Sequence, residues 1–242
     1  MSLLIDADYI VYKSCAANET EIDFGEDLIV VTSNFSDAYG MVERELASIA
    51  NDLGCFDESI LFFSDSVNFR KAIDPAYKGH RNRKKPCGYK RVINKLKEEY
   101  PVVIMPTLEA DDALGIYATK ETGHIICSPD KDMRQIAGDL FDLSTGVVTI
   151  TPEEGRRWHL IQAMAGDQTD GYAGIPGIGI KRAEALLEAN GATWQTVVEA
   201  FAAKDLDESV ALMNARLAKI LQVDDYDFTN QEPRLWNPSS DS

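Results

Sequence analysis

The sequence has few cysteines, and they show no pairing pattern. The four cysteines, Cys15, Cys55, Cys87 and Cys127, are widely spaced and form no C-x-x-C motif. A disulfide scaffold needs a higher cysteine density, and a cysteine-based zinc site needs closer pairs. We therefore expect neither of these features, and a reducing cytoplasm is the expected location of the protein.

Long apolar runs are also absent. No stretch of 18 apolar residues occurs, and the apolar run from Leu3 to Ile5 lacks the basic leader of a signal peptide. We expect neither membrane insertion nor secretion. The chain contains no internal repeat, and 242 residues with 45% hydrophobic side chains suffice for one sizeable core, or for one large and one small domain.

Positive charge is scarce overall but concentrated in one segment. Lys and Arg number 24 against 40 Asp and Glu, which gives a formal net charge of −16. This excess of acid argues at first against a nucleic-acid partner. However, eleven of the cations lie between Arg70 and Lys97, where the single acid is Asp74. A local basic field of this kind can engage phosphates whatever the total charge is.

Short apolar strands alternate with helical patterns through the first part of the chain. The strand patterns cover residues 2–6, 28–32, 60–63, 102–105 and 124–127. The helical patterns begin at a cap formed by Ser36 or Asp37, at Gly88 and at Glu109. This alternation predicts an α/β fold with a mostly parallel central sheet flanked by helices.

Strand patterns stop at about Trp158, and helical patterns dominate from there to Leu221. We therefore predict an α/β core at residues 1–157, a helical region at 158–228 and an irregular tail at 229–242. The basic segment at 70–97 belongs to the core in this division.

Carboxylates follow the ends of several predicted strands. In a parallel sheet, ligands gather outside the carboxyl ends of the strands. Hard divalent cations such as Mg²⁺ prefer carboxylate oxygens, and two such ions can activate a water and stabilise the leaving oxygen of a phosphodiester. The candidate metal ligands are Asp6, Asp65, Glu109, Asp111, Asp112, Asp130, Asp132, Asp167 and Asp170.

Each of these carboxylates also has an ordinary explanation. The E-x-D-D cluster could supply favourable charge at a helix N-terminus, the D-x-D pair of SPDKD could be turn residues, and GDQTDG could be a solvated loop. Only the joint pattern favours metal binding. Asp8 and the acidic run at 224–227 lack this context, and we interpret them as surface charge.

The segment YKGHRNRKK, residues 77–85, combines an aromatic residue with closely spaced cations. Lys and Arg side chains can hold a scissile phosphate and neutralise the charge that develops on it, and Tyr77 could stack on a base. The alternative is a solvated basic loop, which is the usual explanation of a run of charge.

A glycine-rich stretch, GIPGIGIK at residues 174–181, precedes a predicted helix from Lys181 to Glu188. Backbone N–H groups in such a turn, together with the helix dipole and Lys181, can hold a phosphate. This is the helix-hairpin-helix way of gripping a nucleic-acid backbone without reading its sequence. A tight turn between two helices, without any ligand, is the alternative.

The motifs FSDSVNFRKAIDPAYKGHR, LEADDALG, SPDKD and GDQTDGYAGIPGIG, in this order, resemble the 5′-nuclease superfamily of flap endonucleases and phage 5′-to-3′ exonucleases. The resemblance covers roughly residues 3–187 and looks closest to the phage replication exonucleases. It implies a PIN-like nuclease core, in which the basic segment forms a helical arch over the active site. It also implies that the nine carboxylates bind two divalent ions, Mg²⁺ with Mn²⁺ as a substitute, and that the glycine-rich turn can carry K⁺.

The same resemblance implies roles for the basic residues. Lys78 and Arg81 match the cations of the family's Y-K-x-x-R motif and are the candidate catalytic residues. The candidate DNA-binding residues are Arg70, Lys71, Tyr77, Arg83, Lys84, Lys85, Lys90, Gly174, Gly177, Gly179 and Lys181.

We predict a divalent-metal-dependent 5′-to-3′ exonuclease or 5′-flap endonuclease that acts as a monomer on DNA, with RNA primers in hybrids as a further candidate substrate. The first alternative is a structure-selective DNA-binding protein that has the same fold without the chemistry. The second is a nuclease of the related, smaller RNA-cleaving type.

Overall fold

The computed structural model of the chain describes residues 2–54, 58–81 and 84–238. A six-stranded sheet lies at the centre of this part of the chain, in the order β5-β4-β1-β6-β7-β8. The strands are β1 (Leu3–Asp6), β4 (Ser59–Phe62), β5 (Val102–Val103), β6 (Ile125–Cys127), β7 (Gly138–Phe141) and β8 (Val147–Ile150).

Strand β1 is the middle of the parallel part of the sheet. It pairs with β4 on one side and β6 on the other, so that Ile5 lies opposite both Leu61 and Cys127. All three residues are 0% exposed, as expected for a parallel strand covered on both faces. The strands β1, β4 and β6 therefore end at the same edge of the sheet, and the chain that follows each of them lies there.

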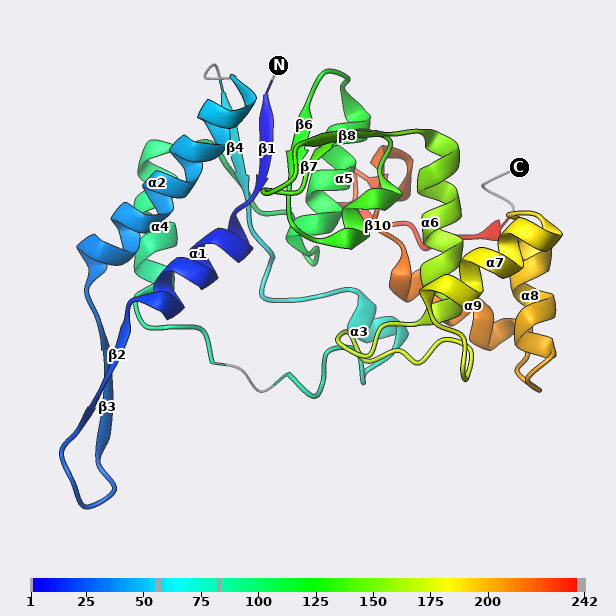
Figure 1. Cartoon of the computed structure of the whole chain (residues 1–242), viewed down its shortest axis with the longest axis horizontal. Coiled ribbons are helices and arrows are strands. Elements are labelled where there is room, and N and C mark those ends of the chain that lie inside the picture. Colours follow the sequence, from blue (N-terminus) through cyan, green and yellow to red (C-terminus); the bar gives the residue numbers. More distant parts are fainter. Residues whose placement is uncertain (1, 55–57, 82–83, 239–242) are drawn as a thin grey trace.

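Helices cover both faces of the sheet (Figure 1). Helices α1 (Ala7–Ala17), α2 (Phe35–Leu53) and α4 (Tyr89–Glu99) bury one set of apolar side chains against β1, β4 and β6. Helix α5 (Ala110–Lys120) packs on the opposite face together with residues 220–226, which include η2 (Val223–Asp225). The result is a three-layer α/β/α arrangement.

A second group of helices packs beside the sheet, at the right of Figure 1. It consists of α6 (Pro152–Ala165), α7 (Ile180–Asn190), α8 (Trp194–Ala202) and α9 (Glu208–Ala218), which share an apolar core. Helix α6 extends across the predicted division between residues 157 and 158, and it also packs against η1 (Lys131–Gln135). The remaining short elements are α3 (Arg70–Ile73), β9 (Tyr226–Asp227) and β10 (Glu232–Pro233).

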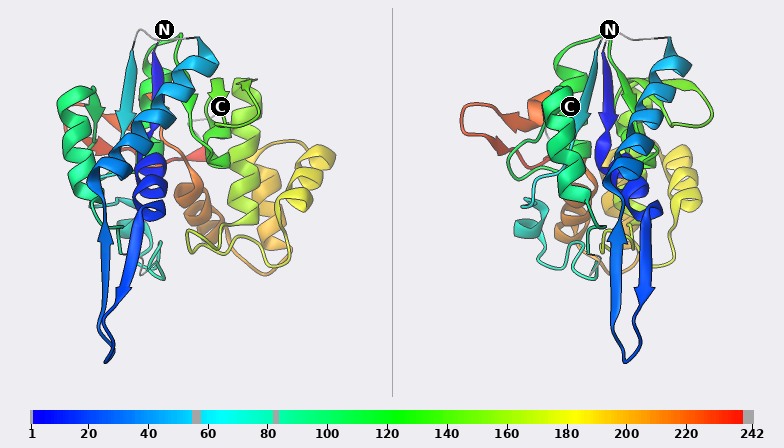
Figure 2. Two further views of the ribbon diagram at one scale, coloured as in Figure 1. Left: turned by 60° about the vertical axis from the view of Figure 1, so that its left-hand side comes forward. Right: turned by 90° about the vertical axis from the view of Figure 1, so that its left-hand side faces the viewer.

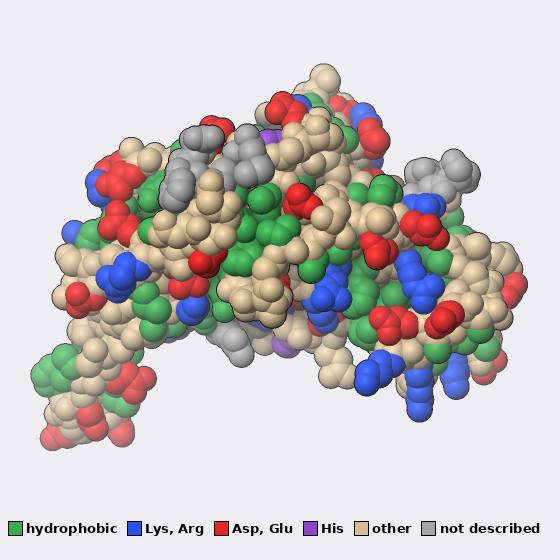
Figure 3. Space-filling model, turned by 45° about the horizontal axis from the view of Figure 1, so that its top comes forward, with side chains coloured by type: hydrophobic (Ala, Val, Ile, Leu, Met, Phe, Trp, Pro, Cys, Tyr) green, Lys and Arg blue, Asp and Glu red, His purple; other side chains and the backbone are tan. Residues whose placement is uncertain are grey.

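A two-stranded hairpin, β2 (Glu19–Asp23) and β3 (Ile29–Ser33), projects from the body between α1 and α2 (Figure 2). Its apolar side chains are exposed, with Phe24 at 64% and Ile29 at 58%. Figure 3 shows these apolar side chains together with acidic ones on the projecting hairpin. No helix among the described residues is long and apolar enough to cross a membrane.

The predicted mostly parallel α/β sheet is confirmed, and the predicted strands correspond to β1, β3, β4, β5 and β6. Strands β7 and β8 and helix α1 were not predicted, and β8 runs antiparallel to β7. The predicted cap of α2 was wrong by two or three residues, because Asn34 accepts the hydrogen bond from the Ser36 N–H. The predicted irregular tail contains the short strand β10.

Two helical glycines provide a matched test of the packing. A Cβ at Gly115 in α5 would lie 2.3 Å from the Leu221 carbonyl oxygen, whereas a Cβ at Gly40 in α2 would meet only the end of the Arg44 side chain at 3.4 Å. We expect Gly40→Ala to raise the free energy of unfolding by roughly 0.5–1 kcal/mol through helix propensity. We expect Gly115→Ala to lower it by about 1–3 kcal/mol through overpacking.

Urea unfolding followed by circular dichroism measures both values. If the two variants changed stability in the same direction and by the same amount, the packing of α5 against residues 220–226 would be wrong.

Candidate active site

A cavity of roughly 410 Å³ opens at the edge of the sheet where β1, β4 and β6 end. Its lining is dominated by acidic side chains, which come from the ends of strands, from α1 and α5, from η1 and from the loop after α6. The carboxylates that line it are Asp6, Asp8, Glu109, Asp111, Asp130, Asp132 and Asp170. Six of these were predicted as metal ligands, and Asp8 was not.

Asp6 lies deepest, where β1 passes into α1. One of its oxygens accepts the Tyr9 N–H at 3.4 Å at the start of α1, and the other accepts the Ser128 hydroxyl at 3.0 Å. Burial, followed by the charge of Asp8, raises the pKa of Asp6 to about 6. Asp6 is therefore held in place by hydrogen bonds, although its negative charge is poorly compensated.

The carboxylate of Asp111 comes from the first turn of α5, and its negative charge is also poorly compensated. Burial raises its pKa well above the ordinary range, and the charges of Asp6, Asp130 and Glu109 raise it further. Asp130 caps η1 by accepting the Asp132 N–H at 2.9 Å. These side chains thus share one region of strongly negative potential.

Asp132 is positioned by two buried amides that the sequence analysis did not identify. Gln162 of α6 donates to Asp132 at 2.5 Å, and Gln135 in turn donates to the Gln162 side-chain oxygen at 2.7 Å. Each of the two glutamines is 2% exposed. Burial, followed by the charge of Asp130, raises the pKa of Asp132 to about 7. The sequence signal for Gln162 is that this polar residue lies among apolar ones in the predicted helical region at 158–228.

Two basic residues reach into the cavity from the segment between α3 and α4. Lys78 forms ion pairs with Glu109 and, at 3.5 Å, with Asp170, and Arg81 pairs with Asp170 at 2.7 Å. Burial acts to raise the pKa of Glu109, but the charges of Lys78 and Arg70 outweigh it and lower that pKa to about 2.

Lys78 also has an unusual backbone. Its φ is +52°, in the left-handed region that non-glycine residues rarely occupy, and its N–H donates to the Asp170 carbonyl oxygen at 2.7 Å. Such strain is found preferentially at functional sites. The structure thus brings the predicted pair Lys78 and Arg81 to the carboxylates.

Arg70 and Asp112 form a buried ion pair outside the set of cavity carboxylates. Two guanidinium nitrogens of Arg70 lie 2.6 and 2.8 Å from the two carboxylate oxygens of Asp112, and the side chain also donates to the carbonyl oxygens of Leu217 and Lys219. Arg70 is 1% exposed and Asp112 is 0% exposed. The predictions of Asp112 as a metal ligand and of Arg70 as a DNA contact are therefore wrong, because both oxygens of Asp112 accept from Arg70, and the buried guanidinium donates only to Asp112, Glu109 and the two carbonyl oxygens.

Two other predicted ligands do not line the cavity. Asp65 accepts the Ser66 N–H at 2.6 Å and the Thr107 N–H at 2.8 Å, so that it stabilises a turn. Asp167 forms an ion pair with Lys131 at 3.0 Å and accepts the Thr169 N–H at 2.7 Å. Asp65 therefore does not line the cavity in this structure, and Asp167 lies beside the cavity, three residues before Asp170.

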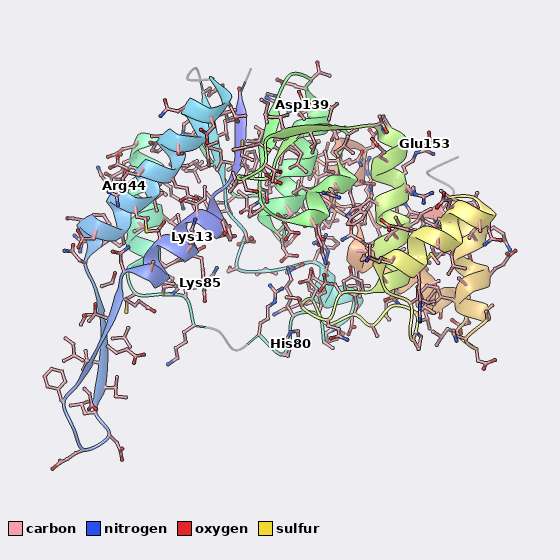
Figure 4. The ribbon with its side chains drawn as sticks, viewed as in Figure 1. Lys13, Arg44, His80, Lys85, Asp139 and Glu153 are labelled. Carbon is pink, nitrogen blue, oxygen red and sulfur yellow. The ribbon has the colours of Figure 1, made fainter. Side chains whose placement is uncertain are left out.

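The predicted basic arch, residues 70–97, begins with α3 and ends within α4, and the described residues between these two helices form turns and irregular chain without a helix. Figure 4 shows His80 on the α3 side of this segment and Lys85 on the α4 side. The predicted contacts Lys71, Lys84, Lys85 and Lys90 are exposed, and Lys85 lines the cavity. Arg83 lies outside the described residues.

Tyr77 does not present its ring for base stacking, because it is 2% exposed. Its hydroxyl oxygen lies 2.9 Å from a carboxylate oxygen of Glu109 and 2.9 Å from one of Asp170, so its single proton is donated to one of them at a time. The prediction of Tyr77 as a stacking residue was wrong, and its role is to orient two cavity carboxylates.

The glycine-rich turn lies between α6 and α7. Gly177, Gly179 and Lys181 are exposed, and α7 begins at Ile180. Gly174 is buried with φ +63°, and its N–H donates to the Asn214 side chain at 3.0 Å. The prediction of Gly174 as a DNA contact is wrong, since its N–H has no capacity left for a phosphate.

The donor chemistry of the cavity suits a hard divalent cation, because every lining carboxylate offers oxygen. Within residues 2–54, 58–81 and 84–238, no three Asp, Glu, His or Cys side chains stand close enough to hold a metal ion as they are. The pairing of Glu109 and Asp170 with Lys78 and Arg81 accounts for part of this, since these carboxylates turn toward the cations. The residues fit a divalent cation, and ligation requires these side chains to move.

Comparison with solved structures supports the fold. The phage T5 D15 protein co-crystallised with metal ions matches with a TM-score of 0.67 at 15% identity, covering 90% of this chain and 89% of that one. The catalytic core of Rad2 in complex with a DNA substrate matches with a TM-score of 0.55 at 11% identity, covering 99% and 84%. At these identities the similarity concerns the fold, and it confirms the predicted fold class.

Sequence comparison goes further. The exodeoxyribonuclease of Enterobacteria phage T3 and the exonuclease of Escherichia phage T7 are each 29% identical to this chain, over 98% of it and 93% of their own lengths. The family model for the 5′-3′ exonuclease, N-terminal resolvase-like domain, matches residues 1–158. These matches confirm the predicted resemblance and the prediction of a nuclease. The chain belongs to the 5′-3′ exonuclease family.

Proposed function

We propose that this chain is a divalent-metal-dependent 5′-to-3′ nuclease that cleaves DNA at 5′ ends or 5′ flaps. The observation that carries the proposal is the cavity itself, in which seven carboxylates face Lys78 and Arg81. The carboxylates offer a site for cations, and the two basic residues offer a site for a phosphate. A phosphodiesterase needs both within one cavity.

The carboxylates Asp6, Glu109, Asp111 and Asp130 would hold a first divalent cation, since the charges of the other three all act on Asp111. Asp132 and Asp170 would contribute to a second, with Asp167 beside them. Mg²⁺ suits this oxygen donor set, and Mn²⁺ is the expected substitute. When bound, such ions supply an activated water and stabilisation of the leaving oxygen.

Lys78 and Arg81 would hold the scissile phosphate. In this structure each is paired with a carboxylate that we assign to the cation site, so the metal-free arrangement neutralises both groups. Binding of cations by Glu109 and Asp170 would release Lys78 and Arg81 toward the substrate. The left-handed backbone of Lys78, whose N–H donates to the Asp170 carbonyl oxygen, would keep this residue beside the cavity.

The turn at Gly177–Lys181 would grip the backbone of duplex DNA through the free N–H groups of the first turn of α7 and the charge of Lys181. Arg182 already donates to the Gly177 carbonyl oxygen at 2.6 Å, so one carbonyl of this turn has a cationic partner. We also propose that other carbonyl oxygens of this turn bind K⁺.

The substrate assignment draws support from the relatives. One solved structure of the T5 D15 flap endonuclease is a complex with DNA and metal ions, and Rad2 was solved with a DNA substrate. We propose DNA as the substrate of this chain as well, with RNA in hybrids as a further substrate, and a monomer as the active form. The location in a reducing cytoplasm stays a prediction.

Asp130→Asn tests the cation site. We expect cleavage of a 5′-labelled flap DNA in Mg²⁺ to fall by roughly 100-fold or more, since even the outer partners of a metal site are typically worth about 10- to 100-fold. Binding of the same DNA at low salt in EDTA should change little, because Asn keeps the shape of the side chain. The control is Asp52→Asn on α2, which removes an exposed carboxylate far from the cavity.

Near-normal turnover in Asp130→Asn would contradict the proposal. If the unaltered protein bound the flap but never cleaved it, in Mg²⁺ or in Mn²⁺, the alternative of a non-catalytic DNA-binding protein would hold. Faster cleavage of single-stranded RNA than of DNA would favour the small RNA-cleaving type.

The pKa shift of Asp132 predicts a pH dependence of stability in EDTA. The pKa of Asp132 is about 7 in the folded protein, whereas in the unfolded chain it is near the ordinary aspartate pKa of 3.8. The folded state therefore binds more protons in this window, and lowering the pH from 8 to 6.5 stabilises it. Asp132→Asn lacks this contribution.

We therefore expect the free energy of unfolding of the unaltered protein, measured relative to Asp132→Asn, to rise by roughly 1 kcal/mol between pH 8 and pH 6.5. Urea unfolding of both proteins at the two pH values gives this difference. Other groups such as His159 titrate in both proteins and cancel. A difference that is independent of pH would show that Asp132 is not a poorly compensated carboxylate.

A further inference from the structure

Two aspartates, Asp8 after β1 and Asp65 after β4, have exchanged the places that the sequence predicts for them relative to the cavity. Asp65 follows β4 and was expected at the metal site, whereas Asp8 was interpreted as surface charge. The structure places Asp8 in the lining of the cavity, and Asp65 does not line it. The residue of the β4 end that does line the cavity is Ser64.

Asp8 is fixed by two hydrogen bonds from different parts of the chain. One carboxylate oxygen accepts the Ser64 N–H at 2.9 Å, and the other accepts the Tyr89 hydroxyl. Asp8 thus stands directly over the end of β4, where the Ser64 backbone holds it. Its charge is also the largest electrostatic influence on Asp6, which shows that the two carboxylates are close.

Asp65 is directed elsewhere by its own hydrogen bonds. One oxygen accepts the Ser66 N–H, and the other accepts the Thr107 N–H. Thr107 has φ +62°, so the Asp65 carboxylate stabilises a strained turn before α5. Asp65 thus stabilises this turn and does not line the cavity, whereas Asp8, whose oxygens are also hydrogen-bonded, lines it together with Asp6.

We propose that the divalent-cation site has Asp8, and not Asp65, as its carboxylate ligand at the end of β4. The proposal rests on the proposed nuclease function, since it names a ligand of that same site. The sequence reason lies in the spacing IDAD: Asp6 caps α1 and Asp8 occupies its first turn, so one helix start presents two carboxylates to the cavity.

The hydrogen bond from Tyr89 links Asp8 to the basic segment. Tyr89 is 5% exposed, it begins α4 within the basic segment, and the Lys85 Nζ lies 4.4 Å from the centre of its ring. Asp8 therefore connects the cation site to the segment that we expect to contact DNA. Tyr89→Phe removes this hydrogen bond and leaves the Asp8 carboxylate in place.

The test compares Asp8→Asn with Asp65→Asn. The two variants make the same chemical change near the end of β4, at a residue that lines the cavity and at one that does not. Mn²⁺ binding to the full chain is measured by isothermal titration calorimetry and by the loss of the free Mn²⁺ electron paramagnetic resonance signal, without DNA. We expect Asp8→Asn to raise the Kd for Mn²⁺ by about 10-fold or more, and Asp65→Asn to change it by less than about 2-fold. Asp8→Glu, which keeps the charge, should recover part of the affinity.

Folding is controlled by circular dichroism and urea unfolding. Asp65→Asn is expected to lose stability without losing Mn²⁺ affinity, because it weakens the turn at Thr107. Binding by Asp8→Asn at the affinity of the unaltered protein, or a loss of affinity in Asp65→Asn instead, would overturn the assignment while leaving the nuclease function intact. If the unaltered protein bound no Mn²⁺ and cleaved no DNA, both the assignment and the proposed function would fail.

Discussion

Mutual repulsion among the cavity carboxylates is the constraint on which the rest of the site depends. Seven acidic side chains meet where three parallel strands end, and burial makes their charges costly. The raised pKa values of Asp6, Asp111 and Asp132 express this cost. Without a bound cation the chain offsets part of it through Lys78 and Arg81, the same residues that we assign to the phosphate.

Two buried polar connections join the helical half of the chain to this site. The Arg70–Asp112 pair joins α3 and α5 to the end of α9 through carbonyl oxygens, and the Gln135–Gln162 pair joins α6 to Asp132. Breaking either connection would leave a buried polar group without its partner, which is costly. The helices that carry the proposed duplex-gripping turn are therefore fixed relative to the carboxylates, and in the proposed function this would set the distance between the gripped duplex and the cleavage site.

Much of this arrangement could be predicted from the sequence, because it follows from strand order. Residues after parallel strands gather at one edge, which placed Asp6, Asp111 and Asp130 correctly. The cap of α2 was misplaced by only a few residues, since Ser, Asp and Asn are nearly equivalent as caps.

The errors have a common cause, which is side-chain direction. Adjacent helical residues point about 100° apart, so Asp111 faces the cavity while Asp112 turns to a buried arginine, and periodicity alone did not indicate which would do so. The exchange of Asp65 for Asp8 depends on a turn at Thr107 that no sequence pattern indicates. Tyr77 was predicted to stack on a base because it lies among closely spaced cations, although its ring is buried.

The most direct test of the account is a crystal structure of the full chain grown with Mn²⁺, examined by anomalous scattering. We predict anomalous peaks inside the cavity within ligand distance of Asp6, Asp8, Asp111 and Asp130, with Lys78 turned away from Glu109. An empty cavity at saturating Mn²⁺, with Lys78 and Glu109 still paired, would contradict the claim that these carboxylates form a cation site.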